Sequence, residues 1–393
     1  MKLDLRRRRA LWRAVVMMST VAAAGAVAGL AHAVPVPARA PHCDDHAAVR
    51  QALERLTRVH RLTGAAVRID DPRCGTWSGT SGTADRHTGR PMRADERVRI
   101  GSITKTFTAV VVLDLVAEGR LSLDDTVDRH LPGLIDRNGY DGRTITVRSL
   151  LQHTSGLPDH TELFPDADTY RFRHFEPEEL VEMALDMPSP GPGWHYSTTG
   201  YVIAGLIVEK VTGRSLEAEV HRRIIRPLGL RDTYWPGDET GIRGPHPRGY
   251  VRQERDGTVR WVDHTERNMS MGGAGGALIS SPRDVNVFFG ALLGGRLLPP
   301  AQLAEMKDVI AADPDRAWEG AEYGLGLMRT VLPCGVEWWG HAGTIYGYST
   351  IAGTSPAGRR VAVSLNENPE NAQAFGDYLN VVQTALCGRP GTE

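Results

Sequence analysis

Ser102 and Lys105 have the residue types and the spacing for nucleophilic catalysis. They lie three positions apart in Gly101-Ser102-Ile103-Thr104-Lys105, at the start of an expected helix, so both face the same side one turn apart. A serine hydroxyl is a poor nucleophile without a base beside it. A lysine can be that base when burial and the helix N-terminus favour its neutral form. The pattern predicts that Ser102 is acylated and that Lys105 takes its proton.

The same pair also has a purely structural explanation, a helix cap followed by a surface lysine. The chain holds only four lysines against forty-two arginines. Its sixteen serines still give a chance S-x-x-K match with odds of about one in six. The weight of the motif therefore depends on what accompanies it.

Tyr196 is the second candidate, in Trp194-His195-Tyr196-Ser197-Thr198 after a loop rich in proline and glycine. A phenol held on such a loop can relay a proton between Ser102 and a leaving group if a neighbouring lysine stabilises the phenolate. A loop tyrosine more often serves only packing. Alone, this motif favours the structural explanation.

The third candidate is His341-Ala342-Gly343-Thr344, at the end of an expected strand. Gly343 would let a substrate approach the backbone closely, and the Thr344 N–H would join that of Ser102 as an oxyanion hole. The H-x-G pattern is common by chance, because His87-Thr88-Gly89 repeats it upstream of the serine.

Sheet-forming segments at both ends of the chain must position these residues. Patterns of strand type occur near residues 64–69, 76–84, 323–331, 336–341, 347–352 and 360–365. Helical periodicity fills the middle, at residues 178–187, 199–211 and 215–225. Consecutive hairpins predict an antiparallel sheet. We expect one α/β lobe built from residues 44–114 and 271–393, a mainly helical lobe of residues 115–270, and a site in the cleft between them. Ser281 is expected to cap a helix, with Asp284 closing a capping box.

The N-terminus has the pattern of an export signal. Basic residues at 6–9 and 13 precede an apolar run over 14–30 and the small-x-small site Ala31-His32-Ala33. We expect a signal peptide over 1–33, a leader over 34–43, and a secreted protein with no stable membrane span after cleavage. An uncleaved anchor is the alternative, since a run of about 17 residues just reaches the spanning range. The export route, general or twin-arginine, stays open.

The formal net charge of −1 gives no electrostatic footprint for nucleic acid, so such a partner is not expected. All four cysteines follow the expected signal, where an oxidising compartment favours disulfides. Three pairings are possible, and the turn positions favour Cys43 with Cys74 and Cys334 with Cys387. Free or metal-binding thiols are the alternative, but no C-x-x-C spacing supports a metal site.

Taken together, S-x-x-K, Y-x-T and H-x-G in this order resemble the serine β-lactamase and penicillin-binding-protein superfamily. The similarity is greatest to secreted actinomycete D-alanyl-D-alanine carboxypeptidases and class C β-lactamase-like hydrolases, and it runs from about residue 47 to 387. It includes the stretches ITVRSLLQHTSGLPD, VTGRSLEAE, PLGLRDTYW, GGALISSPRDV and YGLGL. The resemblance implies a β-lactamase/transpeptidase-like α/β fold, an antiparallel sheet flanked by helices with an inserted all-α lobe.

By this resemblance Ser102 is the nucleophile, Lys105 the base and Tyr196 the proton shuttle, while His341 helps to hold the substrate and the shuttle. The sequence departs from the family in two places. Thr198 stands where the family usually has an asparagine that holds the substrate's acyl carbonyl. Met328 stands where related carboxypeptidases tend to offer an arginine for the terminal carboxylate, and Thr344 and Arg329 are the candidate replacements.

The expected function is a serine-type D-alanyl-D-alanine carboxypeptidase that acts on peptidoglycan peptides without a cofactor or metal, as a monomer. Expected ligands are a small peptide, an ester or a β-lactam. A class C-like β-lactamase or an esterase is the alternative within the class. A non-catalytic binder of β-lactams or cell-wall peptides is the alternative outside it.

Overall fold

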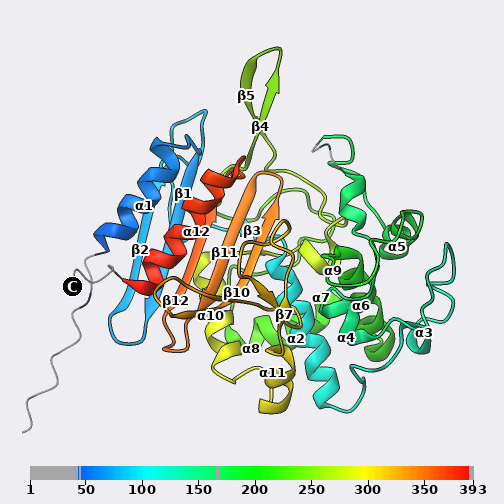
Figure 1. The fold of residues 1–393 in the computed structure, drawn as a ribbon. Helices are drawn as coiled ribbons and strands as arrows, with labels where there is room; N and C mark the ends of the chain where they lie inside the picture. The colour runs from blue at the N-terminus through cyan, green and yellow to red at the C-terminus, as the bar shows by residue number, and fades with distance from the viewer. Residues whose placement is uncertain (1–42, 44–45, 165, 167, 389–393) are drawn as a thin grey trace, which may run out of the picture. The chain divides into compact units, whose positions relative to one another are not determined.

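A sheet that joins strands from both ends of the chain forms the centre of the computed structural model, which describes residues 43, 46–164, 166 and 168–388. Its strands are hydrogen-bonded in the order β2-β1-β12-β11-β10-β9-β8-β7 (Figure 1). Every neighbouring pair is antiparallel, as predicted. The strands are β1 Gly64–Asp71, β2 Gly75–Gly82, β7 Ile310–Ala311, β8 Glu322–Tyr323, β9 Met328–Val331, β10 Glu337–Ile345, β11 Tyr348–Thr354 and β12 Arg360–Leu365.

Helices cover both faces of this sheet, so its central strands are apolar on both sides. In β12, Val361 and Val363 pack with α1 (Ala47–Arg58) and α12 (Ala372–Cys387), which lie side by side in Figure 1. The residue between them, Ala362, packs on the opposite face with α10 (Pro282–Leu293) and α2 (Ile103–Ala117). This period of two follows from the alternation of side chains along a strand.

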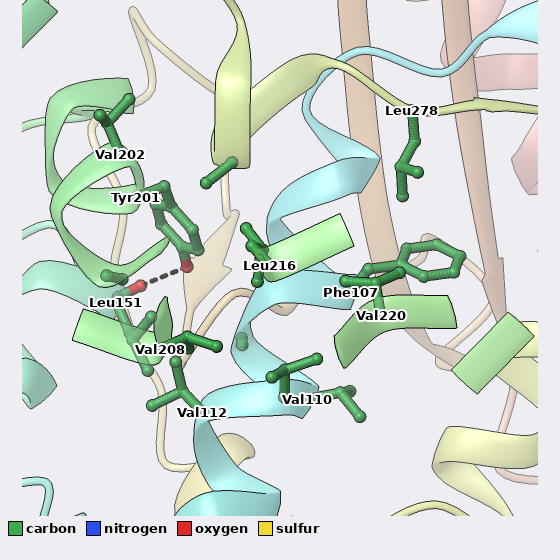
Figure 2. Close-up of a cluster of buried hydrophobic side chains, with 14 of the residues drawn as sticks. Phe107, Val110, Val112, Leu151, Tyr201, Val202, Val208, Leu216, Val220 and Leu278 are labelled. Carbon is green, nitrogen blue, oxygen red and sulfur yellow. Dashed lines mark hydrogen bonds between the residues drawn. The ribbon is translucent and has the colours of Figure 1, made fainter. Parts of the chain in front are cut away.

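The middle of the chain packs against α2, which is mostly apolar and buried through most of its length. Figure 2 shows Phe107, Val110 and Val112 of α2 among residues of the neighbouring helices. These helices are α3 Val127–His130, α4 Val147–Leu151, the 3-10 helix η1 His160–Leu163, α5 Pro177–Leu185, α6 Thr198–Thr212, α7 Leu216–Val220, the π-helix η2 His221–Ile225 and α8 Arg226–Leu228. Shorter connecting elements are β3 Val98–Arg99, β6 Ile279–Ser280, α9 Gly273–Gly276 and α11 Pro300–Met306.

A hairpin of β4 (Tyr250–Arg255) and β5 (Thr258–Asp263) was not predicted, and it projects away from the sheet in Figure 1. Its two-residue turn is Asp256-Gly257, where both residues have positive φ, 54° and 71°. Asp-Gly is a favoured pair for such a turn, because type I′ geometry needs positive φ at both positions. This signal was present in the sequence.

The helix start at Ser281 is only half of the expected capping box. The Ser281 side chain accepts the Asp284 N–H, as predicted. The Asp284 carboxylate is engaged elsewhere, because it accepts hydrogen bonds from the backbone N–H of Asp232 and the hydroxyl of Thr233. This carboxylate therefore ties α10 to the distant segment that follows α8.

Both predicted disulfides are confirmed: Cys43 pairs with Cys74, and Cys334 with Cys387. The second bond fastens the end of α12 to the turn before β10. In the part of the chain that the structure describes, no helix is both long enough and apolar enough to span a bilayer. The expected signal peptide and most of the leader lie outside the described residues.

Candidate active site

Ser102 occupies the N-cap position of α2, three residues after the end of β3 at Arg99 and directly after Gly101. Gly101 has φ +50°, and a Cβ there would lie 2.8 Å from the backbone N of Thr344. Only glycine meets both conditions without strain. The Ser102 side chain does not cap the helix, so its hydroxyl is available to other partners.

Lys105 lies one turn into α2, and its Nζ is 3.2 Å from the Ser102 Oγ. The side chain is completely buried. Burial lowers the pKa of Lys105 from 10.5 to about 7, and the nearby Asp159 carboxylate opposes this shift. A large share of Lys105 is therefore neutral near pH 7, as a general base requires.

Two further groups hold the Lys105 amine from the opposite side. Its Nζ donates to the carbonyl oxygen of Gly275 at 3.0 Å and lies 3.2 Å from the Thr198 Oγ1. Thr198 in turn donates to an Asp159 carboxylate oxygen at 3.4 Å. A Cβ at Gly275 would lie 2.6 Å from Thr198 Cγ2, so this position is closed to any side chain. The amine is thus held by oxygen atoms from three separate segments.

Tyr196 stands just before Ser197, the N-cap of α6, and the start of that helix places its ring over the Lys105 amine. The distance from Lys105 Nζ to the ring centroid is 4.7 Å. Burial raises the pKa of Tyr196 well above its ordinary value, although a hydrogen bond with Ser102 acts in the opposite direction. The phenol therefore keeps its proton at neutral pH.

His341 lies in β10, buried, and borders the same pocket. Its Nδ1 contacts the Ala342 carbonyl, which can only accept, so Nδ1 carries the proton and Nε2 accepts from the Tyr323 hydroxyl at 2.9 Å. Burial lowers the pKa of His341 to about 3. His341 is a neutral residue oriented by Tyr323, a partner that the sequence analysis did not identify.

Gly343 brings the backbone of β10 against the start of α2. A Cβ at Gly343 would lie 1.9 Å from the Ile100 carbonyl oxygen and 2.9 Å from the Ser102 backbone N. No side chain fits there. Together with the contact of Gly101 on Thr344, this places the backbone of Ser102 beside that of Thr344, the two N–H groups predicted for the oxyanion hole.

A pocket of about 510 Å³ opens at Ser102. Its walls are largely aromatic, formed by Phe164, Trp194, Trp318, Tyr323, Tyr346 and Phe375. Charge among the described lining residues comes from Asp159 and Arg316, and Arg316 is paired with Glu162. The pocket therefore suits a mainly apolar group with a polar end.

The position of Arg329 corrects one expectation. Met328 does line the pocket, but the next residue along β9 points elsewhere, because side chains alternate along a strand. The Arg329 guanidinium pairs with Glu322 and Glu337. Arg329 therefore does not replace the missing arginine, and Arg316 is the arginine at the pocket.

The structure thus brings Ser102, Tyr196, Thr198 and His341 to one pocket, and Lys105 is buried beside Ser102 and Thr198. Asp159, Gly275 and Tyr323 were not predicted as site residues, although all three fall in stretches that carry the family resemblance. Over the described residues there is no group of three or more His, Cys, Asp or Glu side chains placed to hold a metal ion.

Comparison with known proteins supports the predicted membership of the serine β-lactamase and penicillin-binding-protein superfamily. The sequence model of the Beta-lactamase family matches residues 49–386. Esterase EstB of Burkholderia gladioli is 32% identical over 340 residues, which cover 75% of this chain and 84% of that protein. A D-stereospecific amidohydrolase from Streptomyces sp. is similar in structure, with a TM-score of 0.78, 40% identity, and coverage of 88% of this chain and 99% of that one.

A D-amino acid amidase from Ochrobactrum anthropi SV3, solved with D-phenylalanine, has a TM-score of 0.72 and 29% identity, with coverage of 86% of this chain and 98% of that one. The match along almost the whole described chain confirms both the predicted fold and the predicted superfamily. The chain belongs to the Beta-lactamase family and is a serine hydrolase of the β-lactamase and penicillin-binding-protein superfamily.

Proposed function

We propose that this protein cleaves an amide or ester bond by moving the acyl group first to Ser102 and then to water. The observation that carries the proposal is the position of Lys105, a buried amine with a pKa of about 7 whose Nζ lies 3.2 Å from the Ser102 Oγ. A surface lysine in the first turn after a helix cap would have neither property. Such pKa perturbation beside a nucleophile is typical of catalytic sites.

In the acylation step, neutral Lys105 takes the proton of Ser102 while the Oγ attacks the substrate's carbonyl carbon. The carbonyl oxygen becomes an oxyanion that the backbone N–H groups of Ser102 and Thr344 stabilise. The carbon–nitrogen or carbon–oxygen bond then breaks. Water hydrolyses the resulting ester, returning the proton to Ser102 and releasing the acid.

Tyr196 is the group that delivers a proton to the leaving amine or alcohol. The leaving group needs an acid, and burial raises the pKa of Tyr196, so the phenol is present in its protonated form. After donation, the nearby Lys105, now an ammonium, stabilises the phenolate and returns a proton to it. In this scheme Lys105 is the general base and Tyr196 is the general acid.

For the substrate, we propose an amide or peptide of a D-amino acid with an apolar side chain. The aromatic lining of the pocket, including Phe164, Trp194 and Phe375, supports an apolar side chain. Similarity to a D-stereospecific amidohydrolase and to a D-amino acid amidase supports the D configuration. A D-alanyl-D-alanine carboxypeptidase is a narrower form of this proposal, in which Arg316 would receive the terminal carboxylate.

The polar end of the pocket favours a substrate with a free amino group. Asp159 is a buried carboxylate that lines the pocket and accepts from Thr198. A carboxylate attracts an ammonium, whereas it repels the carbonyl oxygen of an N-acylated substrate. Thr198 also lacks the amide that would bind such a carbonyl. N-acylated β-lactams should therefore be poorer substrates than D-amino acid amides.

An esterase is the second candidate, supported by the 32% identity with esterase EstB. The chemistry at Ser102 would be the same, and an alcohol leaves more readily than an amine. The sequence resemblance gives further support, since Met328, which lines the pocket, stands where related carboxypeptidases tend to have an arginine.

Incubation with a fluorescent penicillin and with a fluorophosphonate tests the nucleophile. Both should label the wild-type protein at Ser102, and Ser102→Ala should abolish the label. Ser78→Ala, an exposed serine on β2 outside the pocket, is the matched control and should label normally. Wild-type protein that takes up neither reagent would leave the binder alternative standing.

Relative turnover then ranks the substrates. We expect D-phenylalanine amide to be cleaved faster than L-phenylalanine amide, a D-Ala-D-Ala peptide and a chromogenic cephalosporin. If a short p-nitrophenyl ester were hydrolysed faster than every amide, the esterase would be favoured.

We also propose that the chain is exported. The support is the basic and apolar pattern of residues 1–33 together with the two disulfides, which persist in oxidising compartments. N-terminal sequencing of the protein recovered from the culture medium tests this, with Val34 as the expected first residue.

A further inference from the structure

His153 follows α4 in an unusual backbone conformation. Its φ is +63°, in the left-handed region that residues with a side chain rarely adopt. The described part of the chain has four other such non-glycine residues, His46, Arg61, Asn138 and Asp256, and none of them is buried. His153 is 1% exposed. Strain of this kind persists where surrounding contacts hold it and is enriched at functional sites.

Two hydrogen bonds join His153 to the loop that carries Tyr196. The backbone N–H of His195 donates to the His153 carbonyl oxygen at 2.8 Å. The backbone N–H of Ser197 donates to the His153 Nδ1 at 3.1 Å. These two bonds fall on the residues directly before and after Tyr196. One residue therefore clamps the loop on both sides of the phenol.

The His153 ring also supports the Tyr196 ring directly. The ring centroids are 4.3 Å apart, with an interplanar angle of 37°. Tyr323, which orients His341, lies on the same imidazole at 4.6 Å. His153 thus contacts both Tyr196 and Tyr323, the residue that orients His341.

The hydrogen-bond pattern fixes the chemical form of the imidazole. Nδ1 accepts a hydrogen bond, so the proton is on Nε2, and no hydrogen-bond partner for that atom is found among the described residues. Burial lowers the pKa of His153 well below its ordinary value, and a positive charge on the nearby Lys105 acts in the same direction. A buried ring that stays neutral suits a positional role better than a proton-transfer role.

We propose that His153 is the positioning residue of the proton donor, holding the Tyr196 phenol beside Ser102 through the paired bonds to His195 and Ser197. This inference rests on the proposed function. His153 itself touches no reacting atom. Its loss should therefore slow the step that uses Tyr196 while leaving the binding of substrate to the aromatic walls largely intact.

Two variants with amide side chains of different length distinguish the loss of the hydrogen bond from Ser197 to the His153 side chain from a general loss of packing. His153→Asn can place its side-chain oxygen near the position of Nδ1, and asparagine tolerates positive φ. His153→Gln places the oxygen one bond farther out, where it cannot accept from Ser197 in the same geometry. His221→Asn, an exposed histidine on the π-helix, is the control substitution.

We expect His153→Gln to lower the first-order acylation rate about 100-fold with little change in KM, because a small displacement of a catalytic group has an effect of this order. His153→Asn should recover most of the rate. His153→Phe, which keeps the ring and removes the acceptor, should resemble His153→Gln. Equal acylation rates in Asn and Gln variants, or a wild-type rate in His153→Phe, would overturn the proposal.

Hydrogen exchange of the backbone amides at 195 and 197 provides a readout that does not need activity. Faster exchange is expected in His153→Gln and near-native exchange in His153→Asn, at matched global stability. Unchanged exchange in His153→Gln would refute the clamp. If the wild-type Ser102 failed to label, the proposed function would be lost, while the exchange data would still decide whether His153 holds the loop.

Discussion

Replacing Lys105 with methionine tests the electrostatics of the site through both stability and rate. In the folded protein, burial lowers the pKa of Lys105 to about 7, whereas the unfolded chain has a lysine pKa of about 10.4. Between these values the unfolded chain binds more protons than the folded protein, so the free energy of unfolding rises with pH. From pH 7 to pH 9 this single group should add about 2 kcal/mol.

Urea unfolding of the wild type and of Lys105→Met at pH 7 and pH 9 isolates this contribution, because other titrating groups affect both proteins. The wild type should gain about 2 kcal/mol more than the variant between the two pH values. Lys210→Met, an exposed lysine on α6, should behave like the wild type. An identical pH dependence in wild type and Lys105→Met would refute the inferred pKa of Lys105.

The acylation rate gives an independent measure of the same pKa. The neutral fraction of a group with a pKa of about 7 rises about tenfold from pH 6 to pH 8, and the wild-type rate should follow it. Lys105→Met should label at least about a thousandfold more slowly, because the base is gone. A wild-type rate that stays flat across this range would show that Lys105 is not the titrating base.

Three further changes have defined outcomes. Gly343→Ala should slow acylation about 100-fold in labelling assays, because its Cβ would collide with the backbone before Ser102, whereas Gly376→Ala, with no atom near its Cβ, should label normally. Replacing Cys334 and Cys387 together by serine should lower the free energy of unfolding by about 4 kcal/mol, since the bond closes a loop of 53 residues, and a loss below about 1 kcal/mol would contradict this. Asp159→Asn should raise KM for D-phenylalanine amide about tenfold and leave KM for a p-nitrophenyl ester unchanged, and equal effects on both would argue against an ammonium site.

Local patterns were sufficient to predict much of the fold. Most of the predicted strands at both ends and helices between them match observed elements, because alternation and 3.6-residue spacing are properties of neighbouring residues. The run expected near 323–331 was wrong as one strand, because residues 324–327 turn the chain back and pair β8 with β9. The β4–β5 hairpin was missed although its Asp-Gly turn is a local signal. The sequence could not predict that the capping box at Ser281 is only half formed, because the Asp284 carboxylate bonds to a segment that is distant in the sequence.

The sequence by itself determined that Ser102 and Lys105 share one helix face, and the order of its motifs placed the chain in its superfamily. Only the tertiary structure decided the environment of that pair. Gly275 and Thr198 reach the amine from segments more than 90 positions away, and burial by all of these segments together lowers the pKa of Lys105. Desolvation depends on every atom packed around a group, so no local pattern could predict it.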